Sequence, residues 1–187
     1  MRLENKVAII TGGANGIGLA ACERFAEEGA HVIMADFDEV AGHEQEALLK
    51  SKELDVTFLH LDVVDRQSVL KLVEQTIKKF GKIDILINNA GITQDATLLK
   101  MEAEQFQNVL NVNLTGVFNC MQTVVPYMLK NGSGKVINTS SVSGVYGNFG
   151  QTNYAATKAA VVGMTKHGQK NSDVKALMLT LWHQVLR

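Results

Sequence analysis

The chain has 187 residues, of which 46% are hydrophobic and 20% are charged, and its formal net charge is −1. A chain of this size and composition can bury one substantial core, so we expect a single globular domain. The balanced charge gives no indication of nucleic acid or of an acidic partner. The N-terminal M-R-L-E-N-K lacks a signal-type apolar region, and no stretch approaches the roughly 18 apolar residues of a membrane helix, so we expect a cytoplasmic protein without a membrane partner.

The predicted elements alternate between strands and helices along the chain. Continuous apolar runs, of which K-V-A-I-I-T is the first, predict strands at 6–11, 30–36, 56–61, 83–88 and 135–139. Helical periodicity and helix stop signals predict helices at 16–29, 38–50, 65–80, 102–112 and 114–129, and another that begins near Thr152. This order predicts an α/β fold in one domain, with a Rossmann-type, doubly wound parallel sheet.

The first predicted strand leads into a glycine-rich turn, T-G-G-A-N-G-I-G, at residues 11–18. Glycines at such a turn allow close approach to a pyrophosphate, and the N-terminus of the following helix offers free N–H groups. Its place between a buried strand and a helix therefore predicts dinucleotide binding. The residues expected to contact the dinucleotide here are Gly12, Asn15, Gly16, Ile17 and Gly18.

Asp36 ends the second predicted strand, about 20 residues beyond the turn. An acid at this position hydrogen-bonds the adenosine ribose hydroxyls and repels a 2′-phosphate, so Asp36 favours NAD over NADP. The alternatives are that Asp36 is a solvated loop residue, or that Asp38 takes its role.

The two Cys and five His residues bear on redox and metal chemistry. Cys22 and Cys120 lie far apart without C-x-x-C spacing, so we expect reduced thiols in the core. The five His residues form no ligand pattern, and we expect no protein-bound metal.

Tyr154 and Lys158 stand four residues apart in the stretch that runs from residue 140 to residue 158. Residues four apart on a helix share a face, so Lys158 would hold an ammonium beside the Tyr154 phenol and favour the phenolate. A free Tyr has a pKa of about 10, and a Tyr that titrates near neutrality needs roughly 4 kcal/mol of differential stabilisation. The alternative is an ordinary pair on a helix surface, which the four-residue pattern alone favours.

With these motifs in order, the chain from Lys6 to about Lys166 resembles the short-chain dehydrogenases/reductases. The resemblance implies that Asp62 and Val63 sit at the adenine. It also implies that N-N-A-G, at residues 88–91, cradles the cofactor through Asn89, Ala90 and Gly91 and braces the sheet.

The resemblance further implies a catalytic tetrad of Asn113, Ser141, Tyr154 and Lys158. Tyr154 would transfer the proton at the substrate oxygen, and Ser141 would hydrogen-bond that oxygen. Lys158 would lower the Tyr154 pKa and, with Tyr154, contact the nicotinamide ribose, while Asn113 would position a water that refills the proton. Ser140 and Ser143 compete for the role of Ser141, and Asn113 alone would more often be a helix cap, here between two predicted helices.

The segments Q-T-N-Y-A-A-T-K, G-I-T-Q-D and N-V-N-L-T-G-V-F are most similar to the 3-oxoacyl-acyl-carrier-protein reductases and the acetoacetyl-CoA reductases. Such segments also occur in sugar-alcohol and steroid dehydrogenases. The resemblance implies a small-molecule substrate, possibly an acyl thioester, beside a loop at residues 93–99, and a homodimer or homotetramer. Asp36 departs from the NADPH preference of the fatty-acid enzymes.

The chain departs from the family after Lys166, which divides it into an incomplete dinucleotide-binding domain at 1–166 and a non-family tail at 167–187. Restoring one adenine before a reverse translation of the tail gives T-W-A-K-E-L-G-R-K-G-I-N-V-N-A-L-A-P-G, which resembles the family's continuation. We therefore expect a single-base deletion near Lys166, in the gene or in its recorded sequence. A real tail would leave the sheet without the family's last strands and expose the fifth strand, unless residues 175–181 cover it as a strand.

Three functions follow from these observations. The favoured one is an NAD(H)-dependent oxidoreductase that interconverts a secondary alcohol and a ketone, acting on a 3-oxoacyl thioester or a similar small substrate. The second is a truncated, catalytically inactive fragment that binds a dinucleotide. The third, a regulatory dinucleotide-binding module, is disfavoured because all four residues of the tetrad are present.

Overall fold

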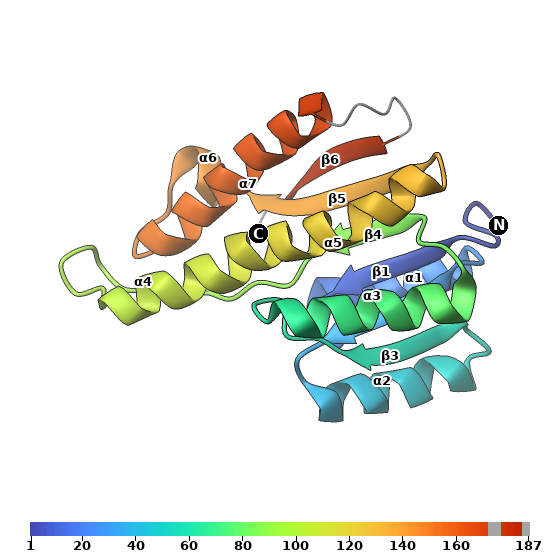
Figure 1. The fold of residues 1–187 in the computed structure, drawn as a ribbon. Coiled ribbons are helices and arrows are strands. Elements are labelled where there is room, and N and C mark those ends of the chain that lie inside the picture. Colours follow the sequence, from blue (N-terminus) through green and yellow to red (C-terminus); the bar gives the residue numbers. More distant parts are fainter. Residues whose placement is uncertain (172–176, 185–187) are drawn as a thin grey trace.

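The computed structural model describes residues 1–171 and 177–184, with side chains up to residue 168. Its sheet is parallel, with the strand order β3-β2-β1-β4-β5-β6 (Figure 1). The strands are β1 (Val7–Thr11), β2 (His31–Asp36), β3 (Val56–His60), β4 (Ile85–Asn88), β5 (Gly134–Ser141) and β6 (Leu177–Gln184). The doubly wound α/β architecture is therefore confirmed, and the switch in strand order falls between β1 and β4.

Helices cover both faces of this sheet (Figure 1). They are α1 (Gly16–Glu27), α2 (Glu39–Ser51), α3 (Arg66–Phe80), α4 (Ala103–Leu110), α5 (Gly116–Lys130), α6 (Ser143–Tyr146) and α7 (Thr152–Asn171), with the π-helix η1 at Asn111–Thr115. α3 and α5 pack on one face, and α1 and α2 pack on the other. The four-residue helix α6 was not predicted.

The central strand β1 is buried along its whole length. Ile9 belongs to the hydrophobic core under α3 and α5, whereas Ala8 and Ile10 belong to the core under α1 and α2. Successive side chains of a strand point to opposite faces, so a strand covered on both sides must be apolar at every position. This requirement explains why the run K-V-A-I-I-T shows no alternation.

Polar caps set two of the helix starts. Asp38 accepts a hydrogen bond from the Ala41 amide at 3.0 Å and begins α2. Asp65 accepts one from the Gln67 amide at 2.9 Å and begins α3. An N-cap satisfies backbone donors that have no partner inside the helix. Asp38 is thus a helix cap in this structure, and the ribose role suggested for it as an alternative has no support.

The predicted break between two helices at Asn113 is wrong. α4, η1 and α5 follow one another without interruption from Ala103 to Lys130, and Asn113 lies in the π-helical turn between them. A π-helical turn inserts one extra residue into an α-helix and is common at functional sites. Here the wider turn accompanies a buried Asn113 side chain that binds backbone groups outside the helix.

The tail supplies the sixth strand. β6 pairs with β5 in parallel from Gly134 opposite Leu177 to Ser141 opposite Gln184 (Figure 1). The strand predicted at 175–181 is therefore confirmed from Leu177 onward and extends to Gln184, while residues 175 and 176 lie outside the described residues. The expected exposure of the outer edge of β5 is not found, because β6 occupies that edge.

Candidate active site

The glycine-rich turn has no room for side chains at two of its three defining positions. Gly12 has a φ of +64°, and a Cβ there would lie 2.9 Å from the Ala90 Cα. A Cβ on Gly18 would lie 1.9 Å from the Gly12 carbonyl oxygen. Gly16, at φ +52°, differs because its Cβ would meet no described atom within 4 Å. Gly12 and Gly18 thus permit close packing, and Gly16 leaves open space above the turn.

Side chains fasten this turn to the segment after β4. The Thr11 hydroxyl accepts hydrogen bonds from the amides of Asn89 at 3.1 Å and Ala90 at 3.0 Å. The Asn89 side-chain amide donates to the carbonyls of Thr11 and Gly12 at 3.2 and 3.1 Å. The N-N-A-G segment therefore braces the turn, and its implied contact with the cofactor remains a prediction.

A cavity of about 720 Å³ opens above the turn and the carboxyl ends of β1, β2 and β4. Its lining includes nine predicted cofactor residues, namely Gly12, Asn15, Gly16, Asp36, Asp62, Val63, Asn89, Ala90 and Gly91. Ile17, Gly18, Tyr154 and Lys158 lie outside the described lining, and Gly18 packs beneath the turn. The structure thus gathers most of the predicted cofactor residues around one space at the switch in strand order, where α/β sheets bind ligands.

The N-terminus of α1 faces this cavity with free backbone donors. Within the described chain, Asn15 makes no side-chain capping bond, and the first turn of α1 carries no acidic residue. Both Asn15 and Gly16 line the cavity. Unpaired N–H groups and the positive end of the helix dipole favour an anionic group, so these residues fit the pyrophosphate of a dinucleotide.

Asp36 is half-buried at the end of β2 and lines the same cavity. One carboxylate oxygen accepts from the Ala14 amide at 2.9 Å, and the other accepts from the Asp38 amide at 3.1 Å. Each oxygen keeps a second acceptor position. The carboxylate is therefore held in place by the backbone while it can still accept hydrogen bonds from hydroxyl groups in the cavity.

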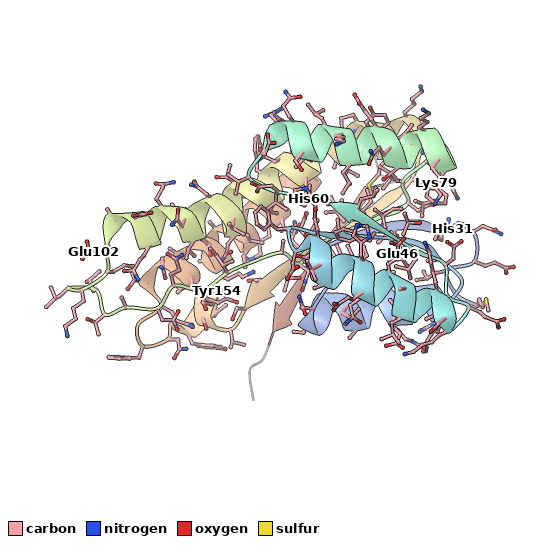
Figure 2. All side chains as sticks on the ribbon, turned by 90° about the horizontal axis from the view of Figure 1, so that it is seen from below. His31, Glu46, His60, Lys79, Glu102 and Tyr154 are labelled. Atoms are coloured by element: carbon pink, nitrogen blue, oxygen red, sulfur yellow. The ribbon has the colours of Figure 1, made fainter. Side chains whose placement is uncertain are left out.

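Ser141, Tyr154 and Lys158 form a second, buried cluster between the end of β5 and α7. Tyr154 is 8% exposed and Lys158 is 4% exposed. The Tyr154 hydroxyl is hydrogen-bonded to Ser141, and Lys158 Nζ lies 5.5 Å from the centroid of the Tyr154 ring. Lys158 also donates to the Thr139 carbonyl at 2.8 Å. Figure 2 shows Tyr154 on the α7 side of the molecule, away from His60 at the end of β3.

The Tyr154 pKa is shifted upward, whereas the sequence predicted a downward shift. Burial raises the Tyr154 pKa above its ordinary value of 10, the hydrogen bond with Ser141 opposes the rise, and the charge of Asp95 adds to it. Burial also lowers the pKa of Lys158 to about 8. The expected lowering of the Tyr154 pKa by Lys158 is therefore wrong for this structure, because desolvation of both groups dominates. At neutral pH the phenol keeps its proton.

The two serines that competed with Ser141 have other partners. Ser140 donates its hydroxyl to the Lys158 carbonyl at 3.0 Å, which ties β5 to α7. Ser143 offers its backbone amide to the Ser141 Oγ at 3.2 Å and begins α6. Only Ser141 among the three is hydrogen-bonded to the Tyr154 hydroxyl in the described structure. These contacts favour Ser141 as the partner of Tyr154.

Asn113 connects the cavity to the catalytic cluster. Its Oδ1 accepts from the Ile92 amide at 2.8 Å, and its Nδ2 donates to the Ile92 carbonyl at 2.9 Å and to Thr157 Oγ1 at 3.4 Å. Thr157 in turn donates to the Tyr154 carbonyl at 2.7 Å. The side chain is thus engaged at both ends, and the water-positioning role remains a prediction.

Three polar residues near Tyr154 were missed by the sequence analysis. Asp95, Gln151 and Asn153 join the segment after β4 to the start of α7 through side-chain hydrogen bonds. The signal was present in G-Q-T-N-Y, where buried amides flank a helix start, but those letters are equally typical of an exposed helix cap.

The described residues contain neither a membrane-spanning helix nor a metal-binding cluster. None of the helices in residues 1–171 is both long and apolar enough to cross a membrane. No group of three or more His, Cys, Asp or Glu side chains within the described ranges is placed to hold a metal ion.

Comparisons with known proteins agree with this geometry. The short chain dehydrogenase family model matches residues 6–177. A 3-oxoacyl-[acyl-carrier-protein] reductase from Thermotoga maritima is 52% identical over 169 residues, which cover 89% of this chain and 68% of that protein. The Staphylococcus aureus protein of the same name is 41% identical over 166 residues, which cover 86% of this chain and 66% of that one.

A solved structure agrees as well. The crystal structure of a short chain dehydrogenase/reductase from Burkholderia phymatum in complex with NAD has a TM-score of 0.92 and 30% identity, and the match covers 98% of this chain and 66% of that one. The chain thus spans about two thirds of the length of these relatives. The family model covers most of the chain, and the chain belongs to the short chain dehydrogenase family.

Proposed function

We propose that the chain is an NAD(H)-dependent oxidoreductase that interconverts a secondary alcohol and a ketone. The observation that carries the proposal is the buried Tyr154, hydrogen-bonded to Ser141 beside Lys158, in a fold whose neighbouring cavity fits a dinucleotide. Tyr154, Ser141, Lys158 and Asn113 are the residues we assign to catalysis.

Tyr154 and Ser141 act on the substrate oxygen. In the direction of reduction, the Tyr154 phenol gives its proton to the carbonyl oxygen, and the raised Tyr154 pKa keeps that proton available at neutral pH. Ser141 donates a hydrogen bond to the same oxygen as negative charge develops there. Bound NADH supplies the hydride that reduces the carbonyl carbon. Oxidation of the alcohol reverses these steps, with Tyr154 as the base.

Lys158 has two functions in this proposal. Its ammonium, 5.5 Å from the centroid of the Tyr154 ring, donates to the Thr139 carbonyl and so holds the end of β5 beside Tyr154. It would also hydrogen-bond the nicotinamide ribose of a bound cofactor. Asn113 holds the segment after β4 through Ile92 and is assigned the water that returns a proton to Tyr154.

The cofactor preference rests on Asp36. Its carboxylate lines the cavity, Asp38 and Glu39 follow it in the chain, and the described lining of the cavity contains no Lys or Arg that could pair with a 2′-phosphate. A phosphate at that position would face like charge, whereas ribose hydroxyls could donate to the Asp36 oxygens. The Burkholderia neighbour, which was solved with NAD, agrees with this preference.

Asp36→Ala tests the cofactor preference. We expect NADH to bind roughly ten- to a hundredfold more weakly, because hydrogen bonds to a charged group contribute about 1.5–3 kcal/mol, and NADPH to bind no more weakly than before. Fluorescence titration with both dinucleotides measures the two Kd values. Equal loss of affinity for NADH and NADPH would show that Asp36 supports the turn through Ala14 without selecting the cofactor.

The substrate class is taken from the named relatives. The Thermotoga and Staphylococcus proteins are named 3-oxoacyl-[acyl-carrier-protein] reductases, so we propose a 3-oxoacyl thioester or a related small ketone as the substrate. The segment 93–99 after β4 would lie beside it. Leu98 and Leu99 in that segment are exposed and suit an apolar acyl group.

Tyr154→Phe tests the reaction. We expect turnover of acetoacetyl-CoA with NADH to fall at least a hundredfold, in keeping with the usual contribution of a general acid. NADH binding should change less than twofold, since the substitution removes a single hydroxyl and leaves the described lining of the cavity unchanged. Absorbance of NADH measures turnover, and fluorescence measures binding. Retained turnover would remove Tyr154 from its assigned role.

A second function is favoured by the length of the matches. Because the chain spans about two thirds of its relatives, an inactive fragment that still binds a dinucleotide is the alternative. NADH binding without turnover by the wild-type chain would establish that alternative.

We also propose that residues 1–166 are family sequence and that 167–187 arise from a shifted reading frame, which resequencing of the gene and the intact mass of the protein would test.

Location and assembly complete the proposal. Cys22 and Cys120 are free and buried, in keeping with a cytoplasmic protein. Phe118 is 45% exposed on α5, which suits a homo-oligomer that buries this helix against a second copy.

A further inference from the structure

Two segments that flank Tyr154 are joined by a short set of hydrogen bonds. The Ala96 amide donates to the Gly150 carbonyl at 2.9 Å, and Gln151 Nε2 donates to Asp95 Oδ2 at 3.0 Å. Ala96 and Gln151 also form an isolated parallel bridge. We call the side-chain bond between Asp95 and Gln151 the clasp. It ties the segment after β4 to the segment before α7, 56 positions later in the chain.

The orientation of the Gln151 amide follows from its two partners. Its Oε1 accepts from Asn148 Nδ2 at 3.0 Å, so its Nε2 is left to donate to the Asp95 carboxylate, which as an ionised group only accepts. Gln151 is 7% exposed, whereas Asp95 is exposed to solvent. A buried amide with both ends satisfied holds a single orientation.

The clasp is connected to Tyr154 through the start of α7. The Gln151 carbonyl accepts from the Ala155 amide at 2.8 Å, which makes Gln151 part of the first turn of the helix. Asn153 donates to the Gln94 carbonyl at 2.9 Å, while its Oδ1 accepts from the Tyr154 amide at 2.7 Å. The segment after β4 is thus bonded on both sides of the helix start from which Tyr154 projects.

We propose that Asp95 and Gln151 are positioning residues whose clasp fixes the start of α7 and so holds the Tyr154 hydroxyl at Ser141. The Asp95 carboxylate, which Gln151 holds in place, is also the charge that raises the Tyr154 pKa. This inference rests on the proposed role of Tyr154 as proton donor. It adds two residues that act through Tyr154 without belonging to the tetrad.

Several other ionisable groups lie on the elements packed against α7. Among the described side chains they are Glu104 on α4, Lys135 on β5, Tyr146 on α6, and Lys158, Lys166 and His167 on α7 itself. Among the described residues, Asp95 is the one whose charge shifts the Tyr154 pKa, and it raises that pKa together with burial. Removal of this charge should therefore move the titration of Tyr154 in one direction, downward.

The first experiment separates charge from hydrogen bonding and needs no turnover. In Asp95→Asn, the Asn oxygen can still accept from Gln151, so the clasp remains while the charge is gone. Carbon-13 NMR of labelled tyrosine rings follows phenol ionisation, and Tyr154→Phe assigns the Tyr154 signal among the three tyrosines. We expect a lower Tyr154 pKa in Asp95→Asn and an unchanged one in Glu74→Gln, an exposed acid on α3.

The second experiment breaks and then restores the clasp. Gln151→Glu places two carboxylates face to face, so we expect the Ala96 amide to exchange with solvent on the order of tenfold faster, a change that corresponds to about 1.4 kcal/mol. The double variant Asp95→Asn with Gln151→Glu recreates a donor and an acceptor in reversed order. We expect it to return exchange at Ala96 to the wild-type rate.

The outcomes decide the inference independently of the proposed function. An unchanged or higher Tyr154 pKa in Asp95→Asn would overturn the electrostatic part, and unchanged exchange in Gln151→Glu would overturn the positioning part. Failure of the double variant to slow exchange again would also count against the clasp, because it would show that Gln151→Glu disturbs packing alone. Both readouts are obtained on the intact chain, so a chain without turnover would contradict the proposed function and leave these results standing.

Discussion

The cofactor side and the catalytic side of this molecule are built in different ways. Around the glycine-rich turn, the structure uses backbone groups and the absence of side chains, as at Gly12 and Gly18. Between β5 and α7 it uses buried polar side chains instead, namely Asn138, Thr139, Ser140, Ser141, Asn153, Thr157 and Lys158. The first arrangement shapes a cavity by close packing, whereas the second keeps reactive groups out of water.

The hydrogen bonding of the two sides differs in the same way. At the turn, Thr11 and Asn89 satisfy backbone donors and acceptors of both segments. In the described residues, the buried side-chain atoms without a hydrogen-bond partner are Asn88 Oδ1 and Thr139 Oγ1. They lie toward the carboxyl ends of β4 and β5. An unpaired buried polar atom destabilises a fold. We therefore expect substitutions at the turn to lower the free energy of unfolding and some substitutions on the catalytic side to raise it.

Gly18→Ala should have the largest effect. The new Cβ would lie 1.9 Å from the Gly12 carbonyl oxygen and 2.7 Å from Asn89 Nδ2, so the turn must shift. We expect the free energy of unfolding to fall by about 3 kcal/mol or more, with loss of NADH binding. Urea denaturation measures the first and fluorescence titration the second.

Gly163→Ala is the matched control for that substitution. Gly163 lies inside α7, and its Cβ would meet no described atom within 4 Å. The higher helix propensity of Ala should raise the free energy of unfolding by up to about 1 kcal/mol. If both variants lost stability equally, close packing at the turn would not explain the result for Gly18.

Lys158→Met should have the next largest effect, and its sign depends on pH. The folded chain holds Lys158 at a pKa of about 8, below the ordinary 10.5, so between these values the unfolded chain binds more protons. Burial of the ammonium therefore destabilises the wild type fully below pH 8, and this cost is lost as the pH rises toward 10.5. We expect the variant to be the more stable at pH 7, by roughly 2 kcal/mol.

The pH profile of that difference provides the control. Cys22, Cys120 and Tyr154, whose pKa values are raised by burial, are common to both proteins and cancel in the comparison. The stability advantage of Lys158→Met should narrow by roughly 2 kcal/mol between pH 8 and pH 10 in urea denaturation series. A difference that stays constant over this range would mean that Lys158 does not carry a lowered pKa.

Thr139→Val should have the smallest effect. Valine has the shape of threonine without the hydroxyl, which in the described structure has no hydrogen-bond partner. We expect the free energy of unfolding to rise by about 1 kcal/mol. Thr157→Val is the control, because the Thr157 hydroxyl donates to the Tyr154 carbonyl at 2.7 Å. In this variant the free energy of unfolding should fall by a similar amount. A loss of stability in Thr139→Val would reveal a partner for that hydroxyl.

The cofactor side was the easier to predict from sequence. Glycines mark positions where the backbone needs a positive φ or close packing, so T-G-G-A-N-G-I-G predicted the turn. The buried strand before it predicted that the turn belongs to a dinucleotide site. Asp36 and the N-N-A-G segment follow strands, and the carboxyl ends of parallel strands meet at one edge of the sheet. Their convergence on one cavity therefore follows from the alternation of strands and helices.

The catalytic side was harder because its features depend on tertiary contacts. The π-helical turn at Asn113 accompanies hydrogen bonds to Ile92, 21 positions earlier, which no local pattern reports. The clasp joins Asp95 to a residue 56 positions away. The direction in which the Tyr154 pKa shifts depends on how deeply the ring is buried, whereas the Y-x-x-x-K spacing indicates only that a cation is near.

The pairing of β6 with β5 bears on how a sheet tolerates a change of sequence at its edge. Eight residues of β5 find partners in Leu177–Gln184, a segment that lies beyond the family model's match except at its first residue. A parallel ladder is formed by main-chain groups that every residue except proline carries in full. An edge strand therefore constrains composition far more than it constrains residue order. If the reading frame changed near Lys166, the sheet would have converted an unselected run of apolar letters into a structural element without any adaptation of the five strands before it.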